Sequence, residues 1–155
     1  MDEKVEQSVT NIITAYIAQI DSAMKISEIL AEHSGDEDIS PDNLIIGLIY
    51  RLMVPMTDAE MKESMDNASK VMDGDTSDEE DDSMDTETTN ELHRTISGEK
   101  NKVERKIKSN NCNCDICSKA RVCLLNYPQY EASDELAQKF SDSIKHACST
   151  HKLLI

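Results

Sequence analysis

An acidic run in the middle of the chain limits how this sequence can fold. Residues 73–93 read "DGDTSDEEDDSMDTETTNELH" and hold ten acidic and no basic side chains. Such a segment has too little apolar surface to offset the entropy lost on folding, and its like charges repel one another. We therefore predict a disordered acidic linker at 73–93, between a helical module at 1–72 and a basic, Cys-rich module at 94–155.

Composition favours two small modules over one large core. Aromatic side chains make up 3% of the 155 residues, and the formal net charge is −15. The first module carries 14 acidic against 5 basic side chains, whereas 94–155 carries 7 acidic against 11 basic ones. A chain this poor in large apolar groups suits short helices better than a large enzyme core, so we predict a mainly α protein.

Two helices are expected in the first half of the N-terminal module. Apolar and small residues recur every three or four positions from 5 to 30, which is the period of one helix face. Gly35 supplies a stop signal beyond this helix. A second, almost wholly apolar helix is expected at 41–54, where Ser40 is a good N-cap and Pro41 suits the first turn.

A third helix is expected at 57–72, because Thr57 and Glu60 form a capping-box pattern at its start. Its apolar stripe is rich in methionine: Met61, Met65, Ala68 and Met72. Such a stripe is usually core, and a flexible thioether face also suits an adaptable binding groove. Together the three helices predict association with a protein partner or with a second copy of the chain.

Hydropathy and cysteine usage indicate the compartment. No apolar run reaches the roughly 18 to 20 residues that cross a bilayer, and the first residues lack the basic and apolar regions of a signal peptide. We expect no membrane partner and a reducing intracellular compartment, the cytoplasm or nucleus. There, five cysteines at close spacing indicate metal binding or redox chemistry rather than a disulfide framework.

Four of the five cysteines lie in the stretch "CNCDICSKARVC" at 112–123. Cys114 and Cys117 form a C-x2-C pair, the spacing at which two thiolates in a turn bind one tetrahedral ion. Cys148 and His151 form a C-x2-H pair and share a face if they lie on a helix. We predict that these four residues bind one zinc ion, which would be structural because four protein ligands leave no open position.

The ligand set has alternatives. Cys112 could replace either member of the C-x2-C pair, so a second set consists of Cys112 or Cys114, Cys117, Cys123 and either Cys148 or His151. Cys123 and Cys148 have apolar neighbours and also fit ordinary buried thiols. A thioredoxin-type pair expects a strand before the C-x2-C and a helix starting at its first cysteine, and the upstream "IKSNN" is polar.

The clearest helix of the second module is expected to begin at Ser133, a good N-cap, with acidic residues in the first turn. Residues on one face of this helix follow at steps of three or four: Leu136, Phe140, Ile144, Cys148 and His151. The C-x2-H pair should therefore emerge at the end of a packed helix face. Upstream, residues 91–108 are weakly helical and mostly polar.

Three functional hypotheses follow. The first is a non-enzymatic zinc-binding interaction or assembly protein. The second is a nucleic-acid-associated regulator that uses the basic 94–121 segment, although no aromatic residues interleave it to stack on bases. The third is a thiol redox protein. In the linker, Thr76 and Ser77 each precede an acid by three residues and are candidate sites for an acid-directed kinase.

One stretch resembles a known group of proteins. Residues 112–148, "CNCDICSKARVCLLNYPQYEASDELAQKFSDSIKHAC", are similar to small uncharacterised proteins of large nucleocytoplasmic DNA viruses. The resemblance covers about a quarter of the chain. It implies a virus-encoded intracellular or virion protein and assigns no role to any residue.

Overall fold

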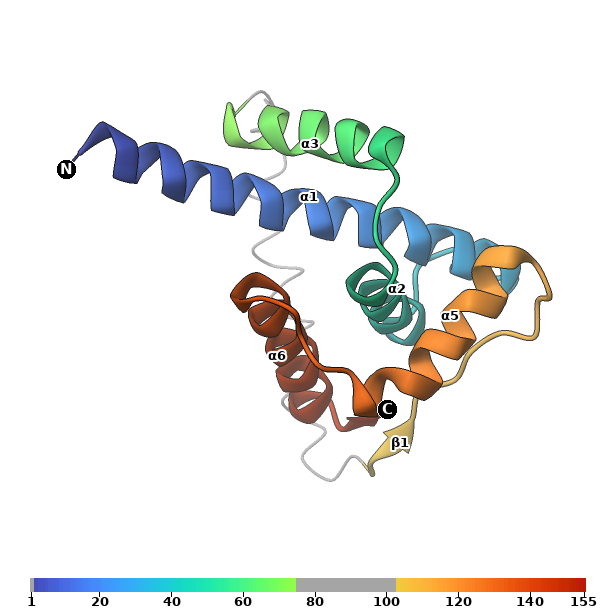
Figure 1. Ribbon diagram of the computed structural model, residues 1–155. Helices are drawn as coiled ribbons and strands as arrows, with labels where there is room; N and C mark the ends of the chain where they lie inside the picture. The colour runs from blue at the N-terminus through green and yellow to red at the C-terminus, as the bar shows by residue number, and fades with distance from the viewer. Residues whose placement is uncertain (1, 75–102) are drawn as a thin grey trace, which may run out of the picture.

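The computed structural model describes residues 2–74 and 103–155, and these form a mainly helical fold, as predicted (Figure 1). The helices of this part are α1 (Glu3–His33), α2 (Pro41–Met53), α3 (Asp58–Met72), α5 (Asp115–Asn126) and α6 (Glu135–Thr150), with a 3-10 turn η2 (Tyr127–Gln129). None of these helices has both the length and the hydrophobicity needed to cross a membrane. The described residues leave out most of the predicted linker, including Thr76 and Ser77. They also leave out residues 94–102 of the predicted basic segment.

The capping residues recognised in the sequence mark where most of the helices begin. The Ser40 hydroxyl accepts a hydrogen bond from the N–H of Asn43 at the start of α2. Thr57 and Glu60 form the expected capping box at the start of α3. At α6 the cap is Asp134 and not Ser133, because its carboxylate accepts from the N–H of Ala137 at 2.7 Å and also complements the helix dipole.

Close approach between α1 and α2 depends on Gly47. A Cβ atom at this position would lie 2.8 Å from the carbonyl oxygen of Ala23 and would also meet the Ser27 hydroxyl. Ser27 is fully buried, and its hydroxyl donates a hydrogen bond to the carbonyl oxygen of Ala23 at 3.0 Å. The two helix backbones therefore cross at a position where any side chain larger than hydrogen would push them apart.

The α3 helix packs on α1 through small side chains rather than through its methionines. Its buried residues are Ser64 and Ala68, which are 1% and 0% exposed, whereas Met61 and Met72 are 48% and 38% exposed. The Asn67 amide donates to Asp21 of α1 at 3.2 Å on the same side of the helix. The buried face therefore includes Ala68 of the predicted stripe and Ser64 outside it, and it leaves Met61 and Met72 exposed, because small residues allow the closer helix contact.

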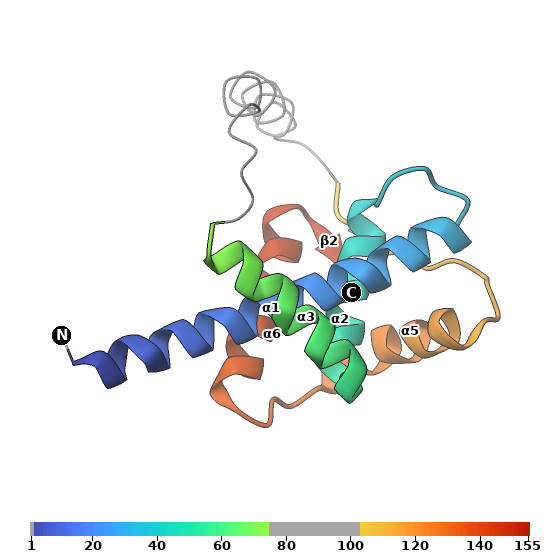
Figure 2. The ribbon, with the colours of Figure 1, turned by 90° about the horizontal axis from the view of Figure 1, so that it is seen from above.

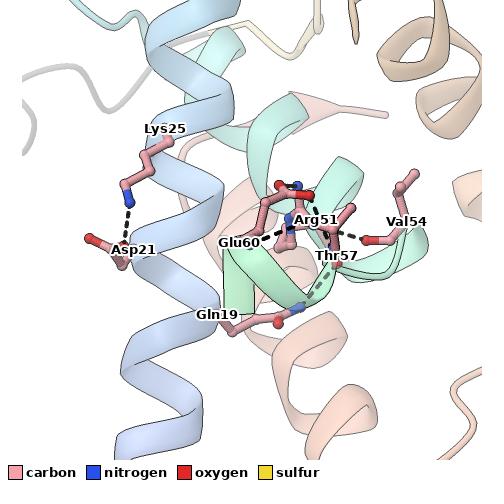
Figure 3. Close-up of polar contacts among 7 residues, drawn as sticks. All are labelled: Gln19, Asp21, Lys25, Arg51, Val54, Thr57 and Glu60. Carbon is pink, nitrogen blue, oxygen red and sulfur yellow. Dashed lines mark hydrogen bonds and ion pairs between the residues drawn. The ribbon is translucent and has the colours of Figure 1, made fainter. Parts of the chain in front are cut away.

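A polar network joins the end of α2 to α1 and α3 (Figure 3). Arg51 is 3% exposed, and its Nη2 lies 2.9 Å from the Glu60 carboxylate. The backbone oxygen of Arg51 accepts from the Gln19 amide at 3.0 Å. On the α3 side of α1, the Lys25 ammonium lies 3.3 Å from Asp21. The buried guanidinium is thus paired with Glu60 through Nη2, and its Nη1 donates to the carbonyl oxygen of Val54, just beyond the end of α2, at 3.4 Å.

The two predicted modules share one hydrophobic core among the described residues. The α2 helix packs on α1 and also on α5 and α6 (Figure 1), and Figure 2 shows the first turns of α1 projecting beyond the other helices. The core cluster combines residues of both modules: Ile26, Leu30, Ile45, Ile46, Ile49, Tyr50, Ile107, Cys117, Ala120, Cys123, Tyr127, Phe140, Ile144, Cys148 and Leu153. The division at 1–72 and 94–155 stays a prediction, and the two parts are in contact.

Candidate metal centre

The segment before the cysteines is held against the start of α2. It contains β1 (Arg105–Lys106), which pairs in parallel with β2 (Leu153–Leu154). The sequence analysis expected weak helix at the position of β1. The Asp42 carboxylate accepts from both terminal nitrogens of Arg105, at 2.9 and 2.6 Å, and from the N–H of Lys108 at 2.8 Å. The Arg105 guanidinium holds the pKa of Asp42 below its usual value. These bonds direct the chain toward the end of α1.

The three clustered cysteines form one turn at the start of α5. Cys114 is the N-cap, and its Sγ accepts from the N–H of Cys117 at 3.4 Å. The Sγ of Cys112 accepts in turn from the N–H of Cys114 at 3.5 Å. The Cys117 N–H lowers the pKa of the Cys114 thiol to about 7, whereas burial raises the pKa of Cys117 to about 11.

The fourth member of the group is His33, in the last turn of α1. Its Nδ1 lies 3.2 Å from the Sγ of Cys112, 3.2 Å from that of Cys114 and 3.4 Å from that of Cys117. All four potential ligand atoms lie within 4.8 Å of one another, so the group could hold a metal ion. A C-x-C-x2-C turn and one distant imidazole therefore converge on a single point.

The geometry and chemistry of these donors fit a tetrahedral ion. Zinc with bonds of about 2.3 Å to sulfur and 2.05 Å to nitrogen would separate the nitrogen from each sulfur by about 3.5 Å. The observed separations of 3.2 to 3.4 Å are slightly shorter, so small outward shifts would accommodate the ion. A cleft of about 490 Å³ borders this group at His33 and Asn110.

Two polar residues support this group. The Asn110 amide donates to the Leu30 carbonyl at 3.2 Å and lies 3.4 Å from the Sγ of Cys117. Its oxygen accepts from the N–H of Cys112 at 3.1 Å. Arg121 of α5 donates to the carbonyl oxygens of Asn110 and Cys112, at 3.0 and 2.6 Å. Both residues link the cysteine turn to its surroundings, as partners beyond the ligands do in metal sites.

The group of potential metal ligands that the structure brings together differs from the predicted set. Cys114 and Cys117 lie together as predicted, and the alternate Cys112 joins them. Cys148 and His151 are not members of the group among the described residues. Cys148 is 4% exposed and continues the packed face of α6, whereas His151 is exposed and caps the end of that helix. The two members of the predicted C-x2-H pair therefore lie apart, with Cys148 in the core and His151 on the surface.

The remaining alternate, Cys123, also lies in the core. It is 7% exposed on the buried face of α5, and burial raises the pKa of both Cys123 and Cys148. Sequence reasoning missed His33, Asn110 and Arg121. Nothing in the spacing relates His33 to a motif 79 residues away, because only the packing of α1 against α5 brings them together.

No protein-family model, curated protein or solved structure matches this chain. The resemblance of 112–148 to viral proteins therefore stays a prediction.

Proposed function

We propose that this chain is a non-enzymatic interaction protein that binds one structural zinc ion. His33, Cys112, Cys114 and Cys117 would be the ligands. The observation that carries the proposal is the position of the His33 Nδ1, which lies within 3.4 Å of three thiol sulfurs. Three thiolates and one imidazole are a donor set that zinc prefers, and four protein ligands leave no position for a substrate or water.

The role of the ion would be to fasten the end of α1 to the start of α5. Large apolar side chains are scarce, and structural zinc contributes on the order of 10 kcal/mol or more to the folding of small metal-binding modules. The thiolates must stay reduced to bind the ion, which supports a reducing compartment. An interaction role is supported by large apolar side chains left exposed on α1 and α3, among them Val5, Val9, Ile12, Met61 and Val71.

A redox thiol is the main alternative for the same residues. Cys114 lies at a helix N-terminus and its pKa is lowered to about 7, and both features also occur in redox pairs. A dithiol pair needs neither a third thiol nor an imidazole equally close to all three sulfurs. The convergence of four donors therefore favours a metal over a disulfide.

The nucleic-acid hypothesis is less well supported by the described part of the basic segment. Arg105 is paired with Asp42, Lys119 lies 3.3 Å from Asp115, and Arg121 donates to backbone carbonyls. Cations engaged in this way are less available to phosphates.

Metal analysis of the full chain, purified under reducing conditions, tests the proposal. We expect one zinc per chain, and cobalt in its place should show the intense absorption of cobalt–thiolate bonds. The triple change Cys112→Ser, Cys114→Ser and Cys117→Ser should abolish binding, whereas the control Cys123→Ser with Cys148→Ser should retain it. A metal-free wild-type chain would overturn the proposal.

A further inference from the structure

The five cysteines divide into two groups by exposure. Cys123 and Cys148 are 7% and 4% exposed within the hydrophobic core. Cys112 and Cys114 are partly exposed at the start of α5, and only Cys117 of that turn is fully buried. An oxidant in the solvent can therefore reach the candidate metal centre, whereas the two core thiols are shielded from it.

The cysteine turn can form a disulfide as well as hold a metal ion. Its three sulfurs lie within 4.8 Å of one another. Cys114 is the N-cap of α5, and its sulfur accepts from the N–H of Cys117 three residues later at 3.4 Å. Helix geometry places Cα atoms three positions apart at about 5 Å, inside the range of about 4.4 to 6.8 Å that disulfides span.

The third thiol is less well placed to join this bond. Cys112 lies before the helix, and a disulfide from it to Cys114 would close a tighter ring that is one residue smaller. The pair that the turn favours is therefore Cys114 with Cys117, and Cys112 would remain a free thiol.

Cys114 is the member of this pair that an oxidant would meet first. Its side chain is partly exposed, whereas Cys117 is 0% exposed. Its position at the N-terminus of α5 also stabilises a negatively charged sulfur, and the thiolate is the form that reacts. Hydrogen peroxide is a small oxidant that takes two electrons, which is the number that one disulfide supplies.

The reaction balances in two stages. The Cys114 thiolate attacks one oxygen of hydrogen peroxide, the O–O bond breaks, and the leaving hydroxide takes a proton to become water. The Cys117 thiolate then attacks the sulfur of the resulting sulfenic acid. This forms the S–S bond, breaks the S–O bond and releases the second oxygen as water after a second protonation. The two sulfurs together give two electrons to the peroxide.

The disulfide would remove two of the four proposed zinc ligands. Cys112 and His33 would remain, and two ligands fall short of the four that a structural zinc ion requires. The α1 helix packs on α5 much less extensively than on α2, so the metal centre is a main link between α1 and α5. Loss of the ion would therefore release the last turn of α1 from the start of α5.

We propose that the centre formed by His33, Cys112, Cys114 and Cys117 is a redox-sensitive switch. Hydrogen peroxide would link Cys114 to Cys117, release the zinc ion and loosen the end of α1 from α5. Small thiols such as glutathione would reverse the reaction by thiol–disulfide exchange, after which zinc can bind again. This inference rests on the proposed structural zinc ion and adds its regulation.

Treating the full, zinc-loaded chain with hydrogen peroxide tests the inference. A chromophoric chelator would follow zinc release, and differential alkylation would locate the disulfide within the tryptic peptide 109–119, which contains all three cysteines of the turn. We expect one zinc ion released per disulfide formed, a free thiol at Cys112, and faster amide exchange at residues 30–33 after release. Dithiothreitol and zinc should restore the starting state.

The core thiols provide the control. In the wild type, Cys123 and Cys148 should stay reduced throughout, and the double change Cys123→Ser with Cys148→Ser should release zinc at the wild-type rate. Zinc content measured before peroxide is added reports on the metal proposal, and a metal-free chain at that stage would overturn both proposals.

A second set of outcomes concerns the switch alone. Zinc that stays bound under conditions that fully oxidise free glutathione would overturn the switch and leave the metal proposal standing. Zinc loss that dithiothreitol and added zinc do not reverse would also overturn it, as would a disulfide that includes Cys112.

Discussion

The Nδ1 atom of His33 lies 3.2 Å from the Sγ atom of Cys114, although the two residues are 81 positions apart in the sequence. This contact joins the last turn of α1 to the first turn of α5. The candidate metal centre therefore bridges the two predicted modules rather than lying within the second one. Metal binding at this centre should therefore affect the stability of both parts of the chain.

Removing the metal should lower the stability of both parts together. A ligand that binds only the folded state stabilises everything that unfolds with its site, and α1, α2, α5 and α6 contribute to one core. We expect a chelator to lower the melting temperature measured by circular dichroism, with restoration by added zinc. An unchanged melting curve would argue against a structural ion, and a loss confined to α5 and α6 would argue against a shared folding unit.

Gly47→Ala should destabilise the helical core. The added Cβ meets the Ala23 carbonyl and the Ser27 hydroxyl, and the backbone oxygen cannot rotate away. Overpacking of this kind costs about 1 to 3 kcal/mol. Urea unfolding would measure the loss, with Lys62→Ala on the exposed side of α3 as the control. Equal stability of Gly47→Ala and wild type would contradict the close crossing.

Acid should weaken the attachment of residues 105–108 to α2. Arg105 lowers the folded-state pKa of Asp42 below its usual 3.8, so the stabilisation is present above that value. It is lost as the pH falls through the lower, folded-state pKa. Asp42→Asn should cost about 2 kcal/mol at neutral pH, because it removes hydrogen bonds to a charged group. Unfolding free energies measured against pH should show a smaller acid loss in Asp42→Asn than in wild type.

The control for this experiment is Asp66→Asn, since Asp66 is exposed on α3. It should follow the wild-type pH dependence. If Asp42→Asn and Asp66→Asn behave alike, the pairing of Asp42 with Arg105 does not contribute to stability.

Asn110→Ala should weaken zinc binding without removing a ligand. The amide of Asn110 connects the Cys117 sulfur to the Leu30 carbonyl, and loss of such a supporting residue typically costs 10- to 100-fold in metal affinity. Competition with a chromophoric chelator would measure this change. Asn126→Ala, at the exposed end of α5, should bind zinc as tightly as wild type. Equal affinities for the two variants would mean that Asn110 has no supporting role.

The helices could be predicted from the sequence because local signals determine them. The caps at Ser40 and Thr57 and the stripe that leads to Leu30 each involve residues within a few positions of one another. The buried face of α3 was predicted only in part: Ala68 of the expected stripe is buried, whereas the close contact with α1 places Ser64 in the core and leaves Met61 and Met72 exposed. Short-range patterns do not report which face a neighbouring helix will choose.

The candidate site was predicted in part for the same reason. Cys114 and Cys117 form a recognisable pair because both lie in one turn. The C-x2-H spacing of Cys148 and His151 is equally regular, but the first side chain packs in the core and the helix ends before the second. His33 belongs to no local pattern, and its role depends on the tertiary packing of α1.

The zinc content of His33→Ala, measured beside that of His151→Ala, tests the central claim most directly. Both histidines are exposed, so neither change should unfold the protein by itself. We expect His151→Ala to retain one zinc per chain, and His33→Ala to lose the ion or bind it far more weakly. Zinc retained at wild-type affinity in His33→Ala, with loss in His151→Ala, would contradict the site built by His33, Cys112, Cys114 and Cys117.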